Sequence, residues 1–193
     1  MTNTATEINS STGVSEAATP SVTNTDTAAI ASPPATITFA DFGLDPKIQK
    51  AVLEQGYNTP TPIQAQSIPH VLAGSDLMGA AQTGTGKTAA FVLPIIQKIL
   101  RHASNSASPA RHPIRALVLT PTRELAVQVA ENAANYSKHT DLRAAVVYGG
   151  VDMKEQVGIL RNGVEILIAT PGRLLDHIGS KVANLSQVEI LVL

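Results

Sequence analysis

Residues 81–88 read Ala-Gln-Thr-Gly-Thr-Gly-Lys-Thr, and the interpretation of the whole chain starts from this stretch. It lies between an apolar run at 77–81, which predicts a strand, and a run with helical spacing at 88–100. A strand, a glycine-rich turn and a helix start, in that order, are typical of a phosphate-binding loop. Because glycine has no Cβ, Gly84 and Gly86 let the backbone turn tightly and place its N–H groups against phosphate oxygens. The stretch predicts a nucleoside triphosphate site.

The side chains of this loop have predicted roles of their own, and we expect Lys87 and Thr88 to be its catalytic pair. Lys87 supplies a cation for the β- and γ-phosphates, and the Thr88 hydroxyl is the expected Mg²⁺ ligand. The usual pattern opens with glycine, whereas this chain has Ala81. The alternative is a glycine-rich turn before an ordinary helix. The residues expected to contact ATP here are Ala81, Gln82, Thr83, Gly84, Thr85, Gly86, Lys87 and Thr88.

Composition sets limits on the class of protein. The apolar share of 44% is enough for a buried core, and the absence of cysteine excludes disulfides and thiolate metal sites. We therefore expect a cytoplasmic protein. No apolar run approaches the roughly 18 residues of a membrane span, so no membrane partner is expected. The net charge of −1 gives no argument for nucleic acid by bulk charge.

The chain divides near residue 38. Residues 1–38 are rich in Thr, Ala, Ser and Pro and show no hydrophobic period, which predicts a disordered tail. Removing its three acidic side chains from the 15 in the chain leaves 12 acidic against 14 basic side chains in residues 39–193. We expect residues 39–193 to form one domain.

Strand and helix patterns alternate through that domain. Helix starts are predicted at Asp45-Pro46 and at Thr61, where Gln64 completes a capping box. Further strands are expected at 115–120, 143–148, 164–170 and 188–193, with helices after the first three. Apolar strands alternating with helices predict an α/β fold, a parallel sheet with helices on both faces. Its ligands should bind at the carboxyl ends of the strands, where 121–123, 149–150 and 170–173 lie.

These residues, with Phe39 and the block 56–64, resemble the first RecA-like domain of DEAD-box ATP-dependent RNA helicases of the bacterial type. The matching blocks run in order from 39 to 193, and Ala81 is ordinary in that family. The resemblance implies a truncated RecA-like P-loop domain whose sheet is incomplete. It further implies an N-terminal fragment that stops just before the Asp-Glu-Ala-Asp motif.

The family assigns further roles. Gln64 would read the adenine edge and Phe39 would pack on the base; the alternatives are helix capping for Gln64 and sealing of the core for Phe39. Loops after three strands would contact single-stranded RNA without reading its sequence. The alternative for those loops is caps and turns. The residues that the resemblance implies for RNA are Pro121, Thr122, Arg123, Gly149, Gly150, Thr170, Pro171, Gly172 and Arg173.

The expected activity is that of the longer protein. The resemblance implies a second RecA-like domain and acidic residues that hold Mg²⁺, so these 193 residues are expected to bind ATP weakly and to be inactive alone. Two alternatives stay open: a non-hydrolysing, nucleotide-dependent RNA-binding module, and another P-loop helicase or ATPase that acts on DNA. The five histidines lack metal-ligand spacing and are expected at the surface.

Overall fold

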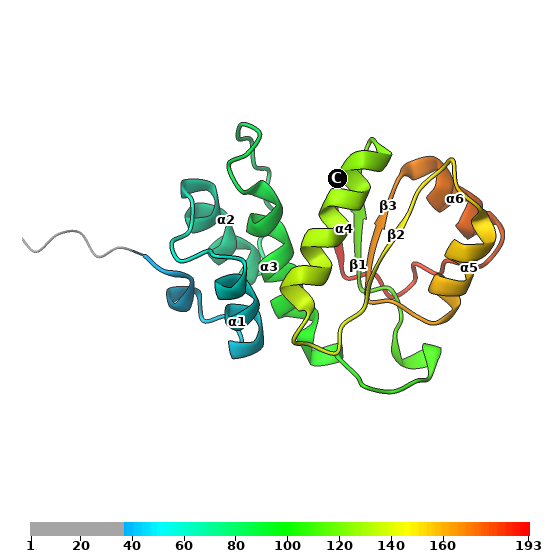
Figure 1. Ribbon diagram of the computed structural model, residues 1–193, viewed down its shortest axis with the longest axis horizontal. Helices are drawn as coiled ribbons and strands as arrows, with labels where there is room; N and C mark the ends of the chain where they lie inside the picture. The colour runs from blue at the N-terminus through cyan, green and yellow to red at the C-terminus, as the bar shows by residue number, and fades with distance from the viewer. Residues whose placement is uncertain (1–36) are drawn as a thin grey trace, which may run out of the picture. The chain divides into compact units, whose positions relative to one another are not determined.

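The computed structural model describes residues 37–193, which form one α/β unit (Figure 1). Of the predicted tail, residues 1–38, all but Ile37 and Thr38 lie outside the described residues. The helices are α1 (Pro46–Glu54), α2 (Pro62–Leu72), α3 (Lys87–Ile99), α4 (Arg123–Ser137), α5 (Met153–Arg161) and α6 (Pro171–Gly179). The strands are β1 (Ala116–Leu119), β2 (Ala144–Val147), β3 (Ile166–Ala169) and β4 (Ile190–Val192), and short 3₁₀ helices span Phe39–Phe42, Leu100–His102 and Pro109–Arg111.

The four strands form a parallel sheet in the order β2-β3-β1-β4. Leu119 pairs with Ala169, and Val147 also pairs with Ala169, so β1, β2 and β3 end level with one another. The loops that follow these three strands therefore emerge at one edge of the sheet. The parallel sheet expected from the apolar strands is confirmed.

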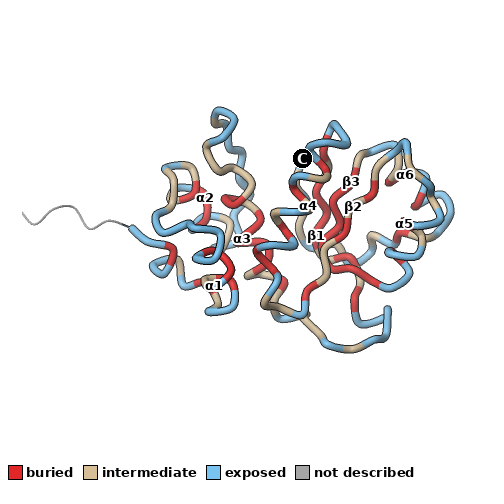
Figure 2. Tube along the Cα trace, in the orientation of Figure 1, coloured by how far each residue is buried: buried red, intermediate tan, exposed pale blue. Residues whose placement is uncertain are grey.

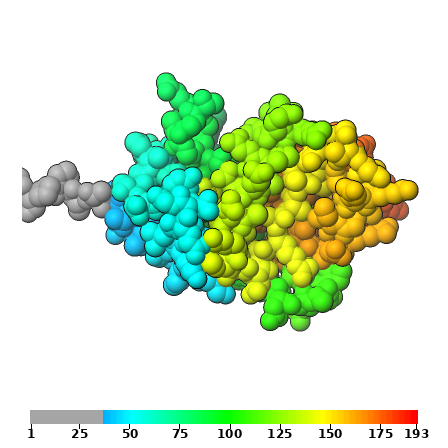
Figure 3. All heavy atoms as spheres, in the orientation of Figure 1, coloured from blue at the N-terminus to red at the C-terminus, as the bar shows by residue number. Residues whose placement is uncertain are grey.

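Helices cover both faces of the sheet. Alternate strand residues point to opposite sides, so each apolar strand contributes side chains to two cores. Val118 and Ile168 face a core shared with α1, α3 and α4. Leu117 and Leu167 face a second core, which Leu174 of α6 helps to fill. Figure 2 shows buried residues concentrated along the strands between these helices. In Figure 3 the surface of α4 lies between the cyan surface of the first helices and the yellow to orange surface that includes α5.

The predicted helix starts are confirmed in atomic detail. The Asp45 carboxylate accepts a hydrogen bond from the Lys47 N–H at 2.8 Å and so caps α1. At the start of α2, Gln64 Oε1 accepts from the Thr61 N–H at 2.9 Å, which is the glutamine half of the predicted capping box. The Thr122 hydroxyl, for which capping was the alternative to RNA contact, accepts from the Leu125 N–H at 3.3 Å and caps α4. Such caps satisfy N–H groups that have no partner within the helix.

The strand predicted at 77–81 is wrong. Residues 75–82 have no regular secondary structure, and the side chains of Leu77 and Met78 are 47% and 97% exposed. A strand needs a neighbour that pairs with its backbone N–H and C=O groups. Within residues 37–193, the sheet has the order β2-β3-β1-β4, and residues 75–82 pair with neither of its edge strands. The apolar pattern alone was therefore not enough to predict a strand.

Two of the histidines expected at the surface are buried: His112 is 1% exposed and His177 is fully buried. His112 Nδ1 lies 2.5 Å from Glu165 Oε1, and its Nε2 lies 2.7 Å from the Ser106 carbonyl oxygen. The second oxygen of Glu165 accepts from the Arg143 N–H at 2.8 Å. This polar cluster ties the connector between α3 and β1 to the amino-terminal ends of the strands. The burial of His112 could not be predicted from the residues around it in the sequence, because its partner Glu165 is 53 positions away.

None of the helices within residues 37–193 is both long and apolar enough to cross a membrane.

Candidate functional site

The glycine-rich stretch 81–88 forms a tight loop that leads into α3. Gly84 and Gly86 have φ values of 80° and 87°, a region that side chains disfavour, and Gly86 is the residue that precedes the first turn of α3. The Lys87 ammonium group folds back and donates to the carbonyl oxygens of Ala81 and of Gln82, the latter at 2.7 Å. The cation is therefore held at the centre of the loop, at the N-terminal end of a helix.

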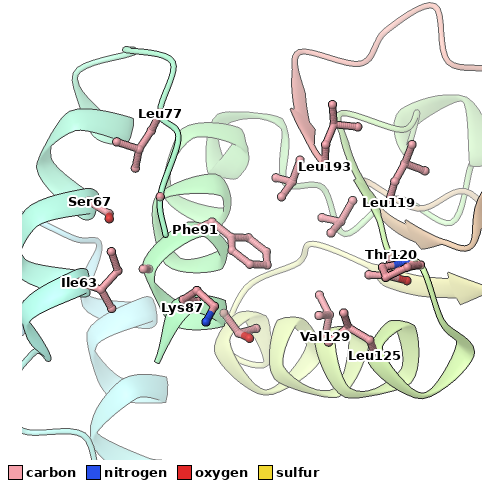
Figure 4. A pocket seen from close by; sticks show the side chains of 16 residues that line it. Ile63, Ser67, Leu77, Lys87, Phe91, Leu119, Thr120, Leu125, Val129 and Leu193 are labelled. Carbon is pink, nitrogen blue, oxygen red and sulfur yellow. The ribbon is translucent and has the colours of Figure 1, made fainter. Parts of the chain in front are cut away.

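A cavity of about 400 Å³ opens beside this loop (Figure 4). Figure 4 shows the Lys87 and Phe91 side chains extending from α3 toward β1 and α4. Thr120 and Pro121, which follow β1, line the same cavity. The cavity thus joins the glycine-rich loop to the carboxyl end of the sheet. Its other lining residues are Ile63, Ser67, Leu77, Gly79, Thr88, Ala90, Val118, Leu119, Leu125, Val129, Val192 and Leu193.

Gln64 connects the start of α2 to the end of the loop. Its Oε1 accepts from the Thr61 N–H at 2.9 Å, and its Nε2 donates to the Gly86 carbonyl oxygen at 3.1 Å. The side chain is buried, with 4% of its surface exposed. The capping role is present in the structure, and a methyl group at position 86 would overlap the Gln64 amide. One amide hydrogen and one oxygen lone pair remain without a partner, and these are the groups that an adenine edge would need.

Phe39 lies in the core. It is 4% exposed, and its ring packs edge-on against Phe42 with centroids 5.9 Å apart. Phe39 therefore has the role given above as the alternative, in which it closes the hydrophobic core. Phe39 does not line the cavity beside Lys87, so the structure does not bring it together with the loop. Its contact with a base stays a prediction.

The loops after β1 and β2 meet at the carboxyl edge of the sheet. Thr122 and Arg123 are exposed, and the Arg123 guanidinium lies over the Tyr148 ring, 4.9 Å from its centroid. Gly149 and Gly150 follow Tyr148 and are exposed; Gly150 has a φ of 85°. A Cβ at position 150 would lie 3.8 Å from Arg123 Nη1, so the cation and the glycine turn are neighbours.

The loop after β3 supplies Thr170, Pro171, Gly172 and Arg173. Pro171 and Gly172 are exposed, whereas the Arg173 side chain is only 11% exposed. Its Nη2 donates at 3.1 Å to the carbonyl oxygen of Val151, which lies in the loop after β2. Thr170 precedes α6, and its hydroxyl makes no capping hydrogen bond.

The two groups of predicted residues are joined by one short segment. Thr120 and Pro121 line the cavity with Lys87, and Arg123, two residues further on, lies beside Gly150. The sequence analysis missed Tyr148, whose ring carries the Arg123 guanidinium. An aromatic residue directly before the glycine pair was the available signal.

A magnesium site at Thr88 fits only part of what the ion requires. Within residues 37–193, no group of three or more His, Cys, Asp or Glu side chains gathers as a metal site. Mg²⁺ commonly takes phosphate oxygens and waters to complete its six ligands. The Thr88 hydroxyl, in the first turn of α3, would therefore hold the ion together with the phosphates of a nucleotide.

Comparison with known proteins decides the family. The DEAD/DEAH box helicase model matches residues 61–193, which include the glycine-rich loop and all four strands. This chain belongs to the DEAD/DEAH box helicase family. The sequence-based assignment, including the RecA-like α/β fold with helices on both faces of the sheet, is confirmed.

Bacterial DEAD-box proteins resemble the chain over most of its length. The chain is 47% identical over 155 residues to the ATP-dependent RNA helicase CshA of Listeria monocytogenes, and the matched region is 80% of this chain and 28% of that protein. It is 43% identical over 156 residues to the DEAD-box ATP-dependent RNA helicase CshA of Bacillus cereus, where the match is 81% of this chain and 28% of that protein. It is 47% identical over 157 residues to the ATP-dependent RNA helicase DeaD of Klebsiella pneumoniae (81% and 23%). The chain spans about a quarter of the length of these relatives.

Proposed function

We propose that this chain is the ATP-binding part, and one portion of the RNA-binding surface, of an ATP-dependent RNA helicase. The helicase would couple ATP hydrolysis to the local opening of RNA duplexes. The relatives that share the domain carry this activity in their names. The observation that carries the proposal is the segment 120–123, which lines the Lys87 cavity at one end and places Arg123 beside Gly150 at the other. A nucleotide and an RNA strand bound at these places would contact opposite ends of this four-residue segment.

The glycine-rich loop would bind the triphosphate of ATP. The Lys87 ammonium group, now on two loop carbonyls, would exchange them for β- and γ-phosphate oxygens. The N–H groups around Gly84 and Gly86 would donate to the same phosphates, and Thr88 would bind Mg²⁺. Bound Mg²⁺ would supply charge neutralisation between the phosphates. Gln64 would recognise adenine with its remaining hydrogen and lone pair.

The carboxyl-edge loops would bind the sugar–phosphate backbone of single-stranded RNA. Arg123 supplies an exposed cation, Thr122 and Thr170 supply hydroxyl groups, and the glycine turn exposes backbone. Such contacts position a strand without reading its bases. Pro121, Pro171 and Gly172 shape the same surface. A second RecA-like domain is the proposed partner for hydrolysis, and a cytoplasmic location remains a prediction from the sequence.

Binding of a fluorescent ATP analogue to the 193-residue chain, with Mg²⁺ present, tests the nucleotide site. Lys87→Ala removes charge-assisted hydrogen bonds worth about 1.5–3 kcal/mol, so we expect affinity to fall about 10- to 150-fold. Lys98→Ala, at the other end of α3, is the matched control and should bind as the unmodified chain does. Unchanged affinity in Lys87→Ala would refute the site.

Fluorescence anisotropy with labelled oligouridylate and oligodeoxythymidylate separates the alternatives. Preference for the RNA supports the proposal, whereas equal or tighter binding of the DNA favours a P-loop enzyme acting on DNA. A second assay separates a helicase from a non-hydrolysing module. It measures ATP hydrolysis by a protein that contains these 193 residues and is as long as the relatives. RNA-stimulated phosphate release is the expected result.

A further inference from the structure

Two buried polar side chains outside the cavity have no role in the proposed chemistry. Gln156 of α5 is 4% exposed, and His177 of α6 is fully buried. Polar groups buried in this way destabilise a fold unless hydrogen bonds compensate for lost water. Their contacts lead to the turn at Gly149–Gly150, which belongs to the RNA surface proposed above.

The contacts form a directed chain of hydrogen bonds. Gln156 Nε2 donates to the Tyr148 carbonyl oxygen at 3.0 Å, which fixes the orientation of the amide. Gln156 Oε1 then faces His177 Nε2 at 3.2 Å, and because an amide oxygen only accepts, His177 Nε2 carries the hydrogen. His177 Nδ1 is buried without a hydrogen-bond partner, so neither a lone pair nor a hydrogen on this atom is satisfied.

The charge around the ring keeps this arrangement in place. Burial lowers the pKa of His177, the positive charge of Arg173 lowers it further, and Asp176 opposes them with a smaller effect. The neutral ring, with its hydrogen on Nε2, is thereby the favoured form. In that form both hydrogen bonds, from His177 to Gln156 and from Gln156 to the Tyr148 carbonyl oxygen, are made.

A second contact holds the other side of the turn. Arg173 Nη2 donates to the Val151 carbonyl oxygen at 3.1 Å. The carbonyl groups on either side of Gly149–Gly150 are thus fixed from within the protein, while both glycines face solvent. Glycine has the most backbone freedom of any residue, so an unsupported glycine pair would lose the most entropy on ordering.

We propose that Gln156 and His177 are positioning residues that hold the Gly149–Gly150 turn in the shape that binds a single-stranded RNA backbone, with Arg173 as the second support. The inference rests on the proposed RNA surface. It reassigns Arg173 from RNA contact to support of the turn, because its side chain is only 11% exposed and its Nη2 already donates to the Val151 carbonyl oxygen, although Nε and Nη1 make no hydrogen bond. Arg123, exposed beside the turn, remains the cation that meets the phosphate.

The variants Gln156→Met and His177→Leu remove the hydrogen bonds at similar side-chain size, and His177→Gln keeps a donor near the place of Nε2. Ordering one backbone residue costs about 1–2 kcal/mol, so freeing the turn should weaken oligouridylate binding about 5- to 30-fold. His177→Gln should recover most of the loss. Affinity for the fluorescent ATP analogue should stay unchanged in all three variants.

Salt dependence distinguishes a support from a contact. Each phosphate contact to a single strand contributes about 0.7 to the slope of log affinity against log salt. Gln156→Met should keep the slope of the unmodified chain, whereas Arg123→Gln should reduce it by about 0.7. A Gln156→Met variant that binds RNA as tightly as the unmodified chain, or that loses RNA and ATP affinity in equal proportion, overturns the inference.

Hydrogen exchange at the amides of residues 149–151 tests the support without RNA. Exchange there should be faster in Gln156→Met and His177→Leu and nearly normal in His177→Gln, with exchange in β1 unchanged. Unchanged exchange at the turn would overturn the inference even if RNA binds. If the unmodified chain binds no RNA, the proposed function fails, while this measurement still decides whether the two residues hold the turn.

Discussion

The alanine variants of Gly84 and Gly86 form a matched pair that tests the contact between the loop and Gln64. The two glycines have similar backbone angles, with φ values of 80° and 87°. An added Cβ at position 84 would meet nothing within 4 Å, whereas one at position 86 would overlap the Gln64 amide nitrogen. The pair therefore shares the backbone strain and differs in one side-chain contact.

The expected losses follow from these contacts. A left-handed conformation costs a non-glycine residue about 1–2 kcal/mol, so Gly84→Ala should lower the free energy of unfolding by about that amount. Gly86→Ala should also displace Gln64 from its bonds to the Thr61 N–H and the Gly86 carbonyl. At about 0.5–1.5 kcal/mol each, the two bonds add roughly 1–3 kcal/mol. For a domain of this size that gap corresponds to about 2–12 °C in Tm.

Thermal and urea unfolding followed by circular dichroism would measure the gap, and a double-mutant cycle with Gln64→Ala would assign it. In the Gln64→Ala background no amide remains to be displaced, so Gly86→Ala should cost no more than Gly84→Ala does. The Gly86→Ala and Gln64→Ala losses should thus be less than additive by about 1–3 kcal/mol. Equal losses in the two glycine variants, or strict additivity in the cycle, would refute the reasoning.

Three further predictions concern titratable side chains. Glu165→Gln changes a fully buried carboxylate that lies 2.5 Å from His112 Nδ1 and accepts from the Arg143 N–H, so the disturbed hydrogen bonds should lower the free energy of unfolding by about 1–3 kcal/mol in urea, with exposed Glu155→Gln as a near-neutral control. The pKa of His177 lies below its ordinary 6.5, so the unfolded chain takes up a proton first. Stability should therefore fall as pH drops below about 6.5, with a smaller fall in His177→Gln. Hydrogen bonds from Lys138, and then His139, lower the pKa of Glu54 to about 2, so stability should fall between pH 4.5 and 2, less steeply in Glu54→Gln. A pH profile identical in a variant and its parent would contradict the corresponding assignment.

Local pattern was enough to place most elements. The helix starts at Asp45 and Thr61 were predictable because the caps and their partners lie within three residues of one another. The strands around 116–119 and 166–169 were predictable because buried parallel strands are apolar throughout. The same rule failed at 77–81, since a strand also requires a partner that no local pattern reveals.

The candidate site divides in the same way. The sequence by itself determined the glycine-rich loop with Lys87 and Thr88, because the geometry of such a tight turn is encoded in consecutive residues. Only the tertiary structure decided that Gln64 bonds to Gly86, that Arg173 turns inward to Val151, and that His177 is buried against Gln156. These contacts join residues 21 or 22 positions apart, and chain folding rather than residue identity brings them together.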